Sequence, residues 1–190
     1  MLHNISYEKL YWMTKFRMLL IVLVIIGAFN WGGYAFDYNL VDLLATKVNN
    51  ESLHIDKIIY ISIAISAFLL AIRKDTWLPF LGWTVMPSAM IPLKPPPNNA
   101  NIKIQIKVSP NAKVIYWAAY GNDKNQHVID AYKDYSNSGV IMSDANGIAE
   151  LSIMEGSGYR VPYRTIERHI HYRVFCTLPG MLGPVKTVKY

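Results

Sequence analysis

The chain has 190 residues, 52% of them hydrophobic, a formal net charge of +6 and a single cysteine, Cys176. A lone cysteine excludes an internal disulfide. No run of Lys and Arg exceeds two residues, so a nucleic-acid partner is not indicated. The length allows one domain of ordinary size together with something smaller.

Residues 18–36 form an apolar stretch, MLLIVLVIIGAFNWGGYAF, without one charge between Arg17 and Asp37. As a helix it would be about 28 Å long, which is close to the thickness of a bilayer's hydrocarbon core. Its surface is apolar all the way round, unlike that of a helix on a soluble domain. The stretch predicts a transmembrane helix, and it is retained because no signal-cleavage site follows it.

Residues in and around this helix suggest how it packs and where it meets the headgroups. Small residues allow a second helix to approach closely, and a buried asparagine needs a hydrogen-bond partner. The packing candidates are Gly27, Asn30, Gly32 and Gly33. Tryptophan and tyrosine prefer the membrane interface. The interface candidates are Trp12, Trp31 and Tyr34, joined further along the chain by Trp77 and Trp83.

A second apolar run, Ile58–Ile72, is followed by Arg73 and Lys74 and predicts a helix over about residues 56–73. Together the two helices would form a transmembrane hairpin, with residues 39–44 as a short interfacial helix in the connecting loop. The flanking cations place both termini on the cytoplasm-like side.

Three motifs, GAFNWG at 27–32, DYNLV at 37–41 and DKIIY at 56–60, occur in this part of the chain. With them, residues 17–73 resemble a small bacterial two-helix membrane domain of unknown function. The resemblance implies a fold and a membrane location, and no chemistry.

Residues 75–100 carry six of the ten prolines together with Trp77 and Trp83. Such a composition is unsuited to regular helix or strand, so we expect extended backbone along the membrane surface. The predicted domain plan is therefore a membrane domain over 1–74, a proline- and tryptophan-rich linker over 75–100 and a β domain over 101–190.

After Asn101 the hydrophobic period changes to two, which indicates strands with one wet face. Turn residues separate the runs, and Asn146-Gly147 is a strong hairpin signal. The predicted strands are 102–108, 113–119, 140–142, 148–154, 168–176 and 185–190. Short strands at this spacing predict an antiparallel β-sandwich or a small barrel, and we favour the sandwich.

His169-Ile-His171 is the sharpest chemical feature, because alternate residues of a strand project from the same face and can share one ion. The simpler alternative is a polar strand face without a metal. The motifs DANGIAELS at 144–152, Gly158-Tyr159 and HIHY at 169–172 resemble the catalytic half of intradiol ring-cleavage dioxygenases, which have a transthyretin-like sandwich. That resemblance implies ferric iron held by two tyrosines and two histidines.

Three of these ligands match Tyr159, His169 and His171. Tyr120 and Tyr132 are both upstream candidates for the fourth, and neither stands in the family's segment. The family's substrate-binding arginine lies in an Arg-Pro-x-His run, whereas Arg168 here abuts His169. On these grounds we expect a colourless β domain without stoichiometric iron.

Residues 75–190 also resemble uncharacterised membrane proteins of nucleocytoplasmic large DNA viruses. The motifs that carry this resemblance are WLPFLG at 77–82, YWAA at 116–119, AYKDYSNSG at 131–139 and GPVKTV at 183–188. It implies an integral membrane protein of the virion membrane, with capsid or other virion proteins as partners beside the lipid bilayer and with self-association through the helices.

The sequence therefore gives two hypotheses from different classes. The first is a membrane-anchored structural or interaction protein without a cofactor. The alternative is a membrane-tethered non-haem iron dioxygenase-like enzyme that requires Fe3+.

Overall fold

The computed structural model describes residues 7–48, 54–121, 123, 126–162, 164–175 and 181–190. Its contacts divide the chain into two compact units. We call Ile5–Pro79 the helical unit and Phe80–Tyr190 the β unit, and each is described by itself.

The helical unit contains α1 (Tyr7–Tyr34), α2 (Leu40–Val48), α3 (Ile55–Ala71) and α4 (Lys74–Trp77). Helix α1 begins well before residue 18, because the residues that precede the apolar stretch include good helix formers and neither glycine nor proline. It ends before residue 36, just ahead of Asp37, whose φ of 60° is left-handed. Within the described part of the chain, one helical stretch, Tyr11–Tyr34, is long and apolar enough to cross a membrane.

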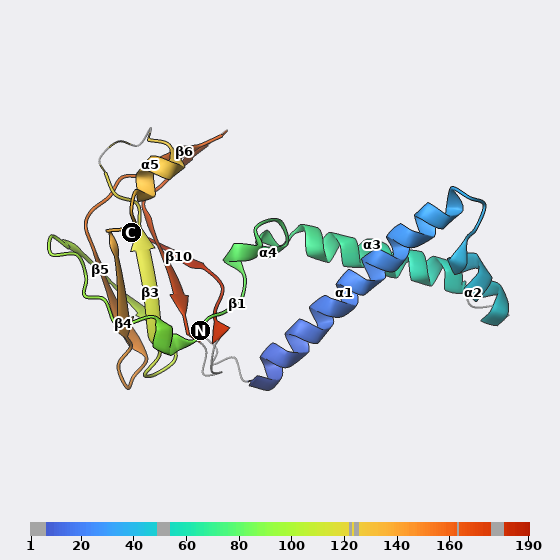
Figure 1. The fold of residues 1–190 in the computed structure, drawn as a ribbon, viewed down its shortest axis with the longest axis horizontal. Coiled ribbons are helices and arrows are strands. Elements are labelled where there is room, and N and C mark those ends of the chain that lie inside the picture. Colours follow the sequence, from blue (N-terminus) through green and yellow to red (C-terminus); the bar gives the residue numbers. More distant parts are fainter. Residues whose placement is uncertain (1–6, 49–53, 122, 124–125, 163, 176–180) are drawn as a thin grey trace. The chain divides into compact units, whose positions relative to one another are not determined.

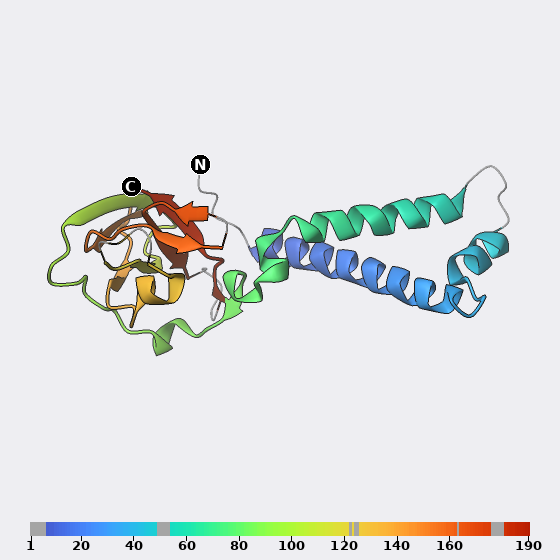
Figure 2. The ribbon, with the colours of Figure 1, turned by 90° about the horizontal axis from the view of Figure 1, so that it is seen from above.

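Helices α1 and α3 lie against each other and run in opposite directions, as Figure 2 shows. Near the end of α1, the Asn30 amide donates to Tyr60 Oη at 3.3 Å. In the first half of α1, Arg17 pairs with Asp75 of α4 at 2.8 Å. The Asp75 carboxylate also accepts from Arg73, and this hydrogen bond holds the pKa of the carboxyl below its usual value.

A buried polar network joins α1, α2 and α3. Asn30 is 3% exposed, and its Oδ1 accepts from the backbone N–H of Val41 at 3.1 Å. Asn39 caps α2 through the same N–H and donates to Tyr60 Oη at 3.0 Å. Asn30 therefore has the partners that its burial requires.

The segment 75–100 differs from the extended linker expected from its prolines. It contains α4, two short 3₁₀ turns at Pro79–Leu81 and Ser88–Met90, and the two-residue strand β1 (Thr84–Val85). The Arg173 guanidinium donates to the carbonyl oxygens of Gly82 and Gly183, both at 2.6 Å. From Phe80 onward the segment is thus part of the β unit, because a long-range cationic donor satisfies its backbone.

The β unit is built from antiparallel pairs (Figure 1). Its largest sheet has four strands in the order β10-β8-β3-β4 and ends at β10 and β4, so the described strands form no closed barrel. The strands of this sheet are β3 (Lys113–Ala118), β4 (Ser138–Met142), β8 (His169–Val174) and β10 (Lys186–Lys189). The described residues also form three two-stranded pairs: β2 (Ile102–Lys107) with β5 (Ile148–Ile153), β6 (Tyr159–Val161) with β7 (Arg164–Ile166), and β1 with β9 (Met181–Leu182).

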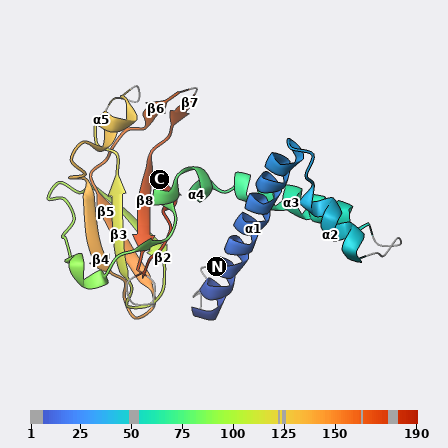
Figure 3. The ribbon, with the colours of Figure 1, turned by 45° about the vertical axis from the view of Figure 1, so that its right-hand side comes forward.

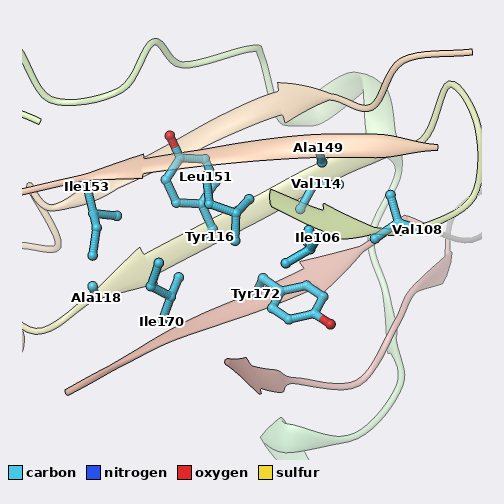
Figure 4. Packing of buried hydrophobic residues seen from close by; sticks show 10 residues of the cluster. All are labelled: Ile106, Val108, Val114, Tyr116, Ala118, Ala149, Leu151, Ile153, Ile170 and Tyr172. Carbon is cyan, nitrogen blue, oxygen red and sulfur yellow. The ribbon is translucent and has the colours of Figure 1, made fainter. Parts of the chain in front are cut away.

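The β2-β5 pair and the four-stranded sheet share one hydrophobic core, drawn in Figure 4. Leu151, Ile153 and Ile170 are fully buried in it. Tyr116 is buried as well, and its hydroxyl donates to the Ser152 carbonyl oxygen at 3.1 Å, so the phenol brings no unpaired polar group into the core.

The predicted antiparallel β structure is confirmed. Each of the six predicted strands is present with ends that differ by at most two residues, and Cys176, at the end of one of them, lies outside the described residues. The antiparallel pair β6-β7 and the short helix α5 (Val128–Tyr132) were not predicted.

Candidate metal centre

His169 and His171 lie on the face of the four-stranded sheet that points away from the shared core. Both belong to β8, and Ile170 and Tyr172, which alternate with them, point into the core. The two Nε2 atoms are 3.1 Å apart. The strand therefore directs both imidazoles at one point, as their spacing predicts.

Tyr159 is the first residue of β6 and follows an irregular segment that ends in Gly158. A glycine is needed there, since a Cβ at Gly158 would collide with the carbonyl oxygen of Ile166 on β7. Tyr132 is the last residue of α5. The N–H of Arg160 on β6 donates to the Gln126 carbonyl at 2.9 Å, just before α5. Figure 3 shows α5 and β6 at the same end of the β unit.

The loop after α5 is fixed to the sheets by Asn137, which is 1% exposed. Its amide donates to the carbonyl oxygens of Ala119 and Met154, both at 3.0 Å, and its Oδ1 accepts from the Met154 N–H at 2.9 Å. Because α5 is too short to be stable alone, bonds of this kind from neighbouring segments help to keep Tyr132 in place.

Tyr132 is the fourth member of the cluster. Its Oη lies 3.2 Å from Tyr159 Oη and 3.3 Å from His169 Nε2. The other upstream candidate, Tyr120, does not join it; the Lys133 ammonium lies over the Tyr120 ring, 4.5 Å from its centroid. We call Tyr132, Tyr159, His169 and His171 the Tyr/His cluster.

The hydrogen bonds of the two imidazoles show which nitrogens face the centre of the cluster. His169 Nδ1 lies 2.6 Å from the Glu167 carbonyl oxygen, which can only accept. In the neutral ring Nδ1 therefore carries the hydrogen, and Nε2 presents a lone pair toward Tyr132 and His171. His171 Nδ1 lies 3.0 Å from Thr187 Oγ1, and a hydroxyl can donate or accept.

The cluster is largely shielded from water. Tyr132, Tyr159 and His169 are 8%, 7% and 7% exposed. Burial raises the pKa of the Tyr132 phenol, and the hydrogen bond with Tyr159 raises it further. Without a cation this phenol is neutral at pH 7, so a bound metal would have to displace its proton.

Three of the six separations among the four donor atoms, Tyr132–Tyr159, Tyr132–His169 and His169–His171, are those expected around a single metal ion. Two ligands about 2.1 Å from one ion are about 3.0–3.4 Å apart when they subtend 90–109°. The observed separations of 3.1, 3.2 and 3.3 Å lie in this range. No three His, Cys, Asp or Glu side chains gather as ligands in the described residues, so this donor set depends on its two tyrosines.

The arginine next to the cluster faces elsewhere. Arg168 pairs with Glu155, and both residues line a surface cavity of about 740 Å³. Trp117 and Tyr135 lie beside the cluster instead: the Trp117 and His171 rings are 5.6 Å apart, and the Tyr132 and Tyr135 rings are stacked at 5.7 Å. Their sequence contexts give no signal of this arrangement.

The predicted interface residues are divided between the two units. Trp12, Trp31 and Tyr34 project from α1 and are more than half exposed. Trp77 is exposed on α4, and its indole N–H donates to the Ala71 carbonyl at 2.7 Å. Trp83 is partly buried in the β unit, beside Gly183. A membrane location for all five stays a prediction.

The three glycines of α1 have different surroundings. A Cβ on Gly27 would lie 2.7 Å from Ile63 Cγ2, so α3 approaches closely here. A Cβ on Gly33 would lie 2.7 Å from the Tyr38 carbonyl oxygen, which belongs to the loop after α1. A Cβ on Gly32 would meet nothing within 4 Å, so Gly32 makes no close contact with the described part of this chain, and its role in helix packing stays a prediction.

These features define a chain with an apolar helical unit and an antiparallel β unit that carries a tyrosine and histidine cluster. Residues 14–73 match the family model described as "Domain of unknown function (DUF378)", which spans most of α1, all of α2 and α3, and about a third of the chain. The match lies over the apolar α1 and agrees with the predicted domain of unknown function. No curated protein matched the chain.

Proposed function

We propose that the protein is a membrane-anchored non-haem iron protein of the dioxygenase-like type. The observation that carries this proposal is the Tyr/His cluster, in which three pairs of donor atoms, linking all four side chains, are separated by 3.1–3.3 Å. The sequence argument against iron was the missing fourth ligand together with the misplaced substrate arginine. Tyr132 supplies a candidate for the ligand, whereas Arg168 pairs with Glu155. Two phenolates and two imidazoles form the ligand set of the intradiol dioxygenases that the sequence resembles.

In this proposal the chain's own residues hold and orient the centre. The strand β8 supplies both imidazoles, the Glu167 carbonyl fixes the His169 ring, and α5 and β6 close the site from one end. Ferric iron, when bound, supplies a Lewis-acidic and redox-active centre. The β2-β5 pair stacked on the four-stranded sheet supports a transthyretin-like sandwich as the scaffold.

The iron site is tested by adding ferric citrate to the purified full-length protein in detergent and removing unbound metal. About one iron per chain and a visible tyrosinate charge-transfer band are expected. Metal analysis and the absorption spectrum measure both. A colourless protein without bound iron would end the enzyme proposal.

The anchor in this proposal is a transmembrane hairpin of α1 and α3. Support comes from the apolar span Tyr11–Tyr34 and from the exposed apolar side chains of α3, among them Ile61, Ile65 and Phe68. We expect the protein to stay in the membrane pellet after alkaline carbonate extraction and to require detergent for release. Recovery of the protein in the carbonate supernatant would contradict the anchor.

A structural or interaction protein is the second candidate, and one observation favours it. The cluster can close without a metal: Thr187 can donate to His171 Nδ1, His171 Nε2 to His169 Nε2, and His169 Nδ1 to Glu167. In that case the cluster is a stabilising network. The virion membrane, capsid partners and self-association belong to this candidate and remain predictions, which detection of the chain in purified virions would test.

A further inference from the structure

His171 is held from both sides by neighbouring strands. In the register of the four-stranded sheet it lies between Trp117 of β3 and Thr187 of β10. The Trp117 ring is 5.6 Å from the imidazole, and Thr187 Oγ1 is 3.0 Å from its Nδ1. The two imidazoles thus differ, because His169 is fixed by a main-chain carbonyl and His171 by a side-chain hydroxyl.

We infer that Thr187 is a positioning residue for the metal centre, which orients the His171 ring and makes Nε2 its ligating nitrogen. This inference rests on the proposed iron site. Metal-bound imidazoles commonly donate their second ring N–H to an outer partner that fixes the tautomer. The hydroxyl of Thr187 can accept that hydrogen when His171 Nε2 binds the ion.

The same hydroxyl can reverse its role when no metal is bound. In the neutral His169 ring Nε2 presents a lone pair, so with this ring neutral the 3.1 Å contact between the two Nε2 atoms is a hydrogen bond when His171 Nε2 carries a hydrogen. Nδ1 then accepts from Thr187. A hydroxyl can rotate to donate or to accept, so it can pair with either tautomer of the imidazole. A carbonyl oxygen can only accept, so it pairs with one tautomer. Thr187 therefore preserves the arrangement of the ligands before and after metal binding.

The test compares Thr187→Val, which removes the hydroxyl at nearly constant shape, with Thr187→Ser, which keeps it. Thr165→Val, an exposed change on β7, is the matched control. Thr187 is itself exposed, so water can partly replace its hydroxyl. We therefore expect Thr187→Val to weaken ferric iron binding about tenfold, the lower end of the range for outer-shell partners. Competition with a chelator measures the affinity.

Two further readouts separate positioning from a general loss of stability. The charge-transfer band of the iron-loaded protein should shift in Thr187→Val and return to the wild-type position in Thr187→Ser. In the metal-free protein, the ¹⁵N resonance of His171 Nδ1 should move in Thr187→Val while that of His169 Nδ1 stays in place.

The outcomes distinguish the inference from the function on which it rests. If the wild-type protein binds no iron, the proposed function fails, and the metal-free ¹⁵N spectra still test the Thr187 contact. If the wild type binds iron and Thr187→Val binds it equally well with an unchanged band, the iron site stands and the inference is overturned. An unmoved His171 Nδ1 resonance overturns it in either case.

Discussion

Replacing Tyr132 with phenylalanine is expected to lower the affinity of the protein for ferric iron by about 100-fold or more. Outer-shell changes alone typically cost metal sites about 10–100-fold, and this change removes a donor atom that lies 3.2 Å from Tyr159 Oη and 3.3 Å from His169 Nε2. The remaining charge-transfer band should be weaker, because one of the two phenolates is gone. Chelator competition and the visible spectrum measure the two effects.

Tyr135→Phe is the matched control, because the Tyr135 ring stacks on Tyr132 at 5.7 Å but is 54% exposed and lies outside the Tyr/His cluster. It should bind iron like the wild type. Circular dichroism should be unchanged in both variants, since each removes only a hydroxyl. Equal iron affinity of Tyr132→Phe and Tyr135→Phe would remove Tyr132 from the site.

Periodicity predicted what depends on neighbours in sequence. Alternation from Ile102 onward gave the strands, and the spacing of His169 and His171 placed both rings on one sheet face, where their Nε2 atoms lie 3.1 Å apart. Similarly, the uncharged stretch 18–36 predicted the apolar helix α1. These inferences hold because the repeat of a helix or strand fixes the direction of each side chain.

The sequence named Tyr132 as one of two candidates for the fourth ligand, but it could not decide between them. The contact between Tyr132 and His169 joins residues 37 positions apart in sequence. The position of Tyr132 depends on a five-residue helix and on Lys133 and Tyr135, which have φ values of 44° and 58°. Neither residue type indicates a left-handed backbone. The strand register that pairs Thr187 with His171 is likewise a long-range property.

The proline-rich segment was misjudged for a related reason. Prolines exclude long helices and central strands, but they do not show whether the backbone of the segment forms hydrogen bonds with distant parts of the chain. Here Arg173 reaches the Gly82 carbonyl across 91 positions of sequence. That contact, the pairing of β1 with β9 and the bridge between Lys94 and Val140 join the segment from Phe80 onward to the β unit.

Replacing Gly27 with leucine is expected to separate α1 from α3 and to lower the thermal midpoint of the helical unit in detergent. A Cβ at this position would already lie 2.7 Å from Ile63 Cγ2 and 3.2 Å from Ile63 Cδ1. Ile63 is branched at Cβ, so its Cγ2 cannot move aside without a change of rotamer. Overpacking of this kind costs about 1–3 kcal/mol, and a whole leucine side chain should reach the upper end.

Gly32→Leu is the matched control on the same helix, because a Cβ there would meet nothing within 4 Å. It should leave the midpoint unchanged or raise it slightly, since leucine is the better helix former. Adding Ile63→Ala to Gly27→Leu should restore much of the stability by making room for the new side chain. If both leucine variants melt alike, or if Ile63→Ala brings no recovery, then close packing at Gly27 does not hold α1 and α3 together.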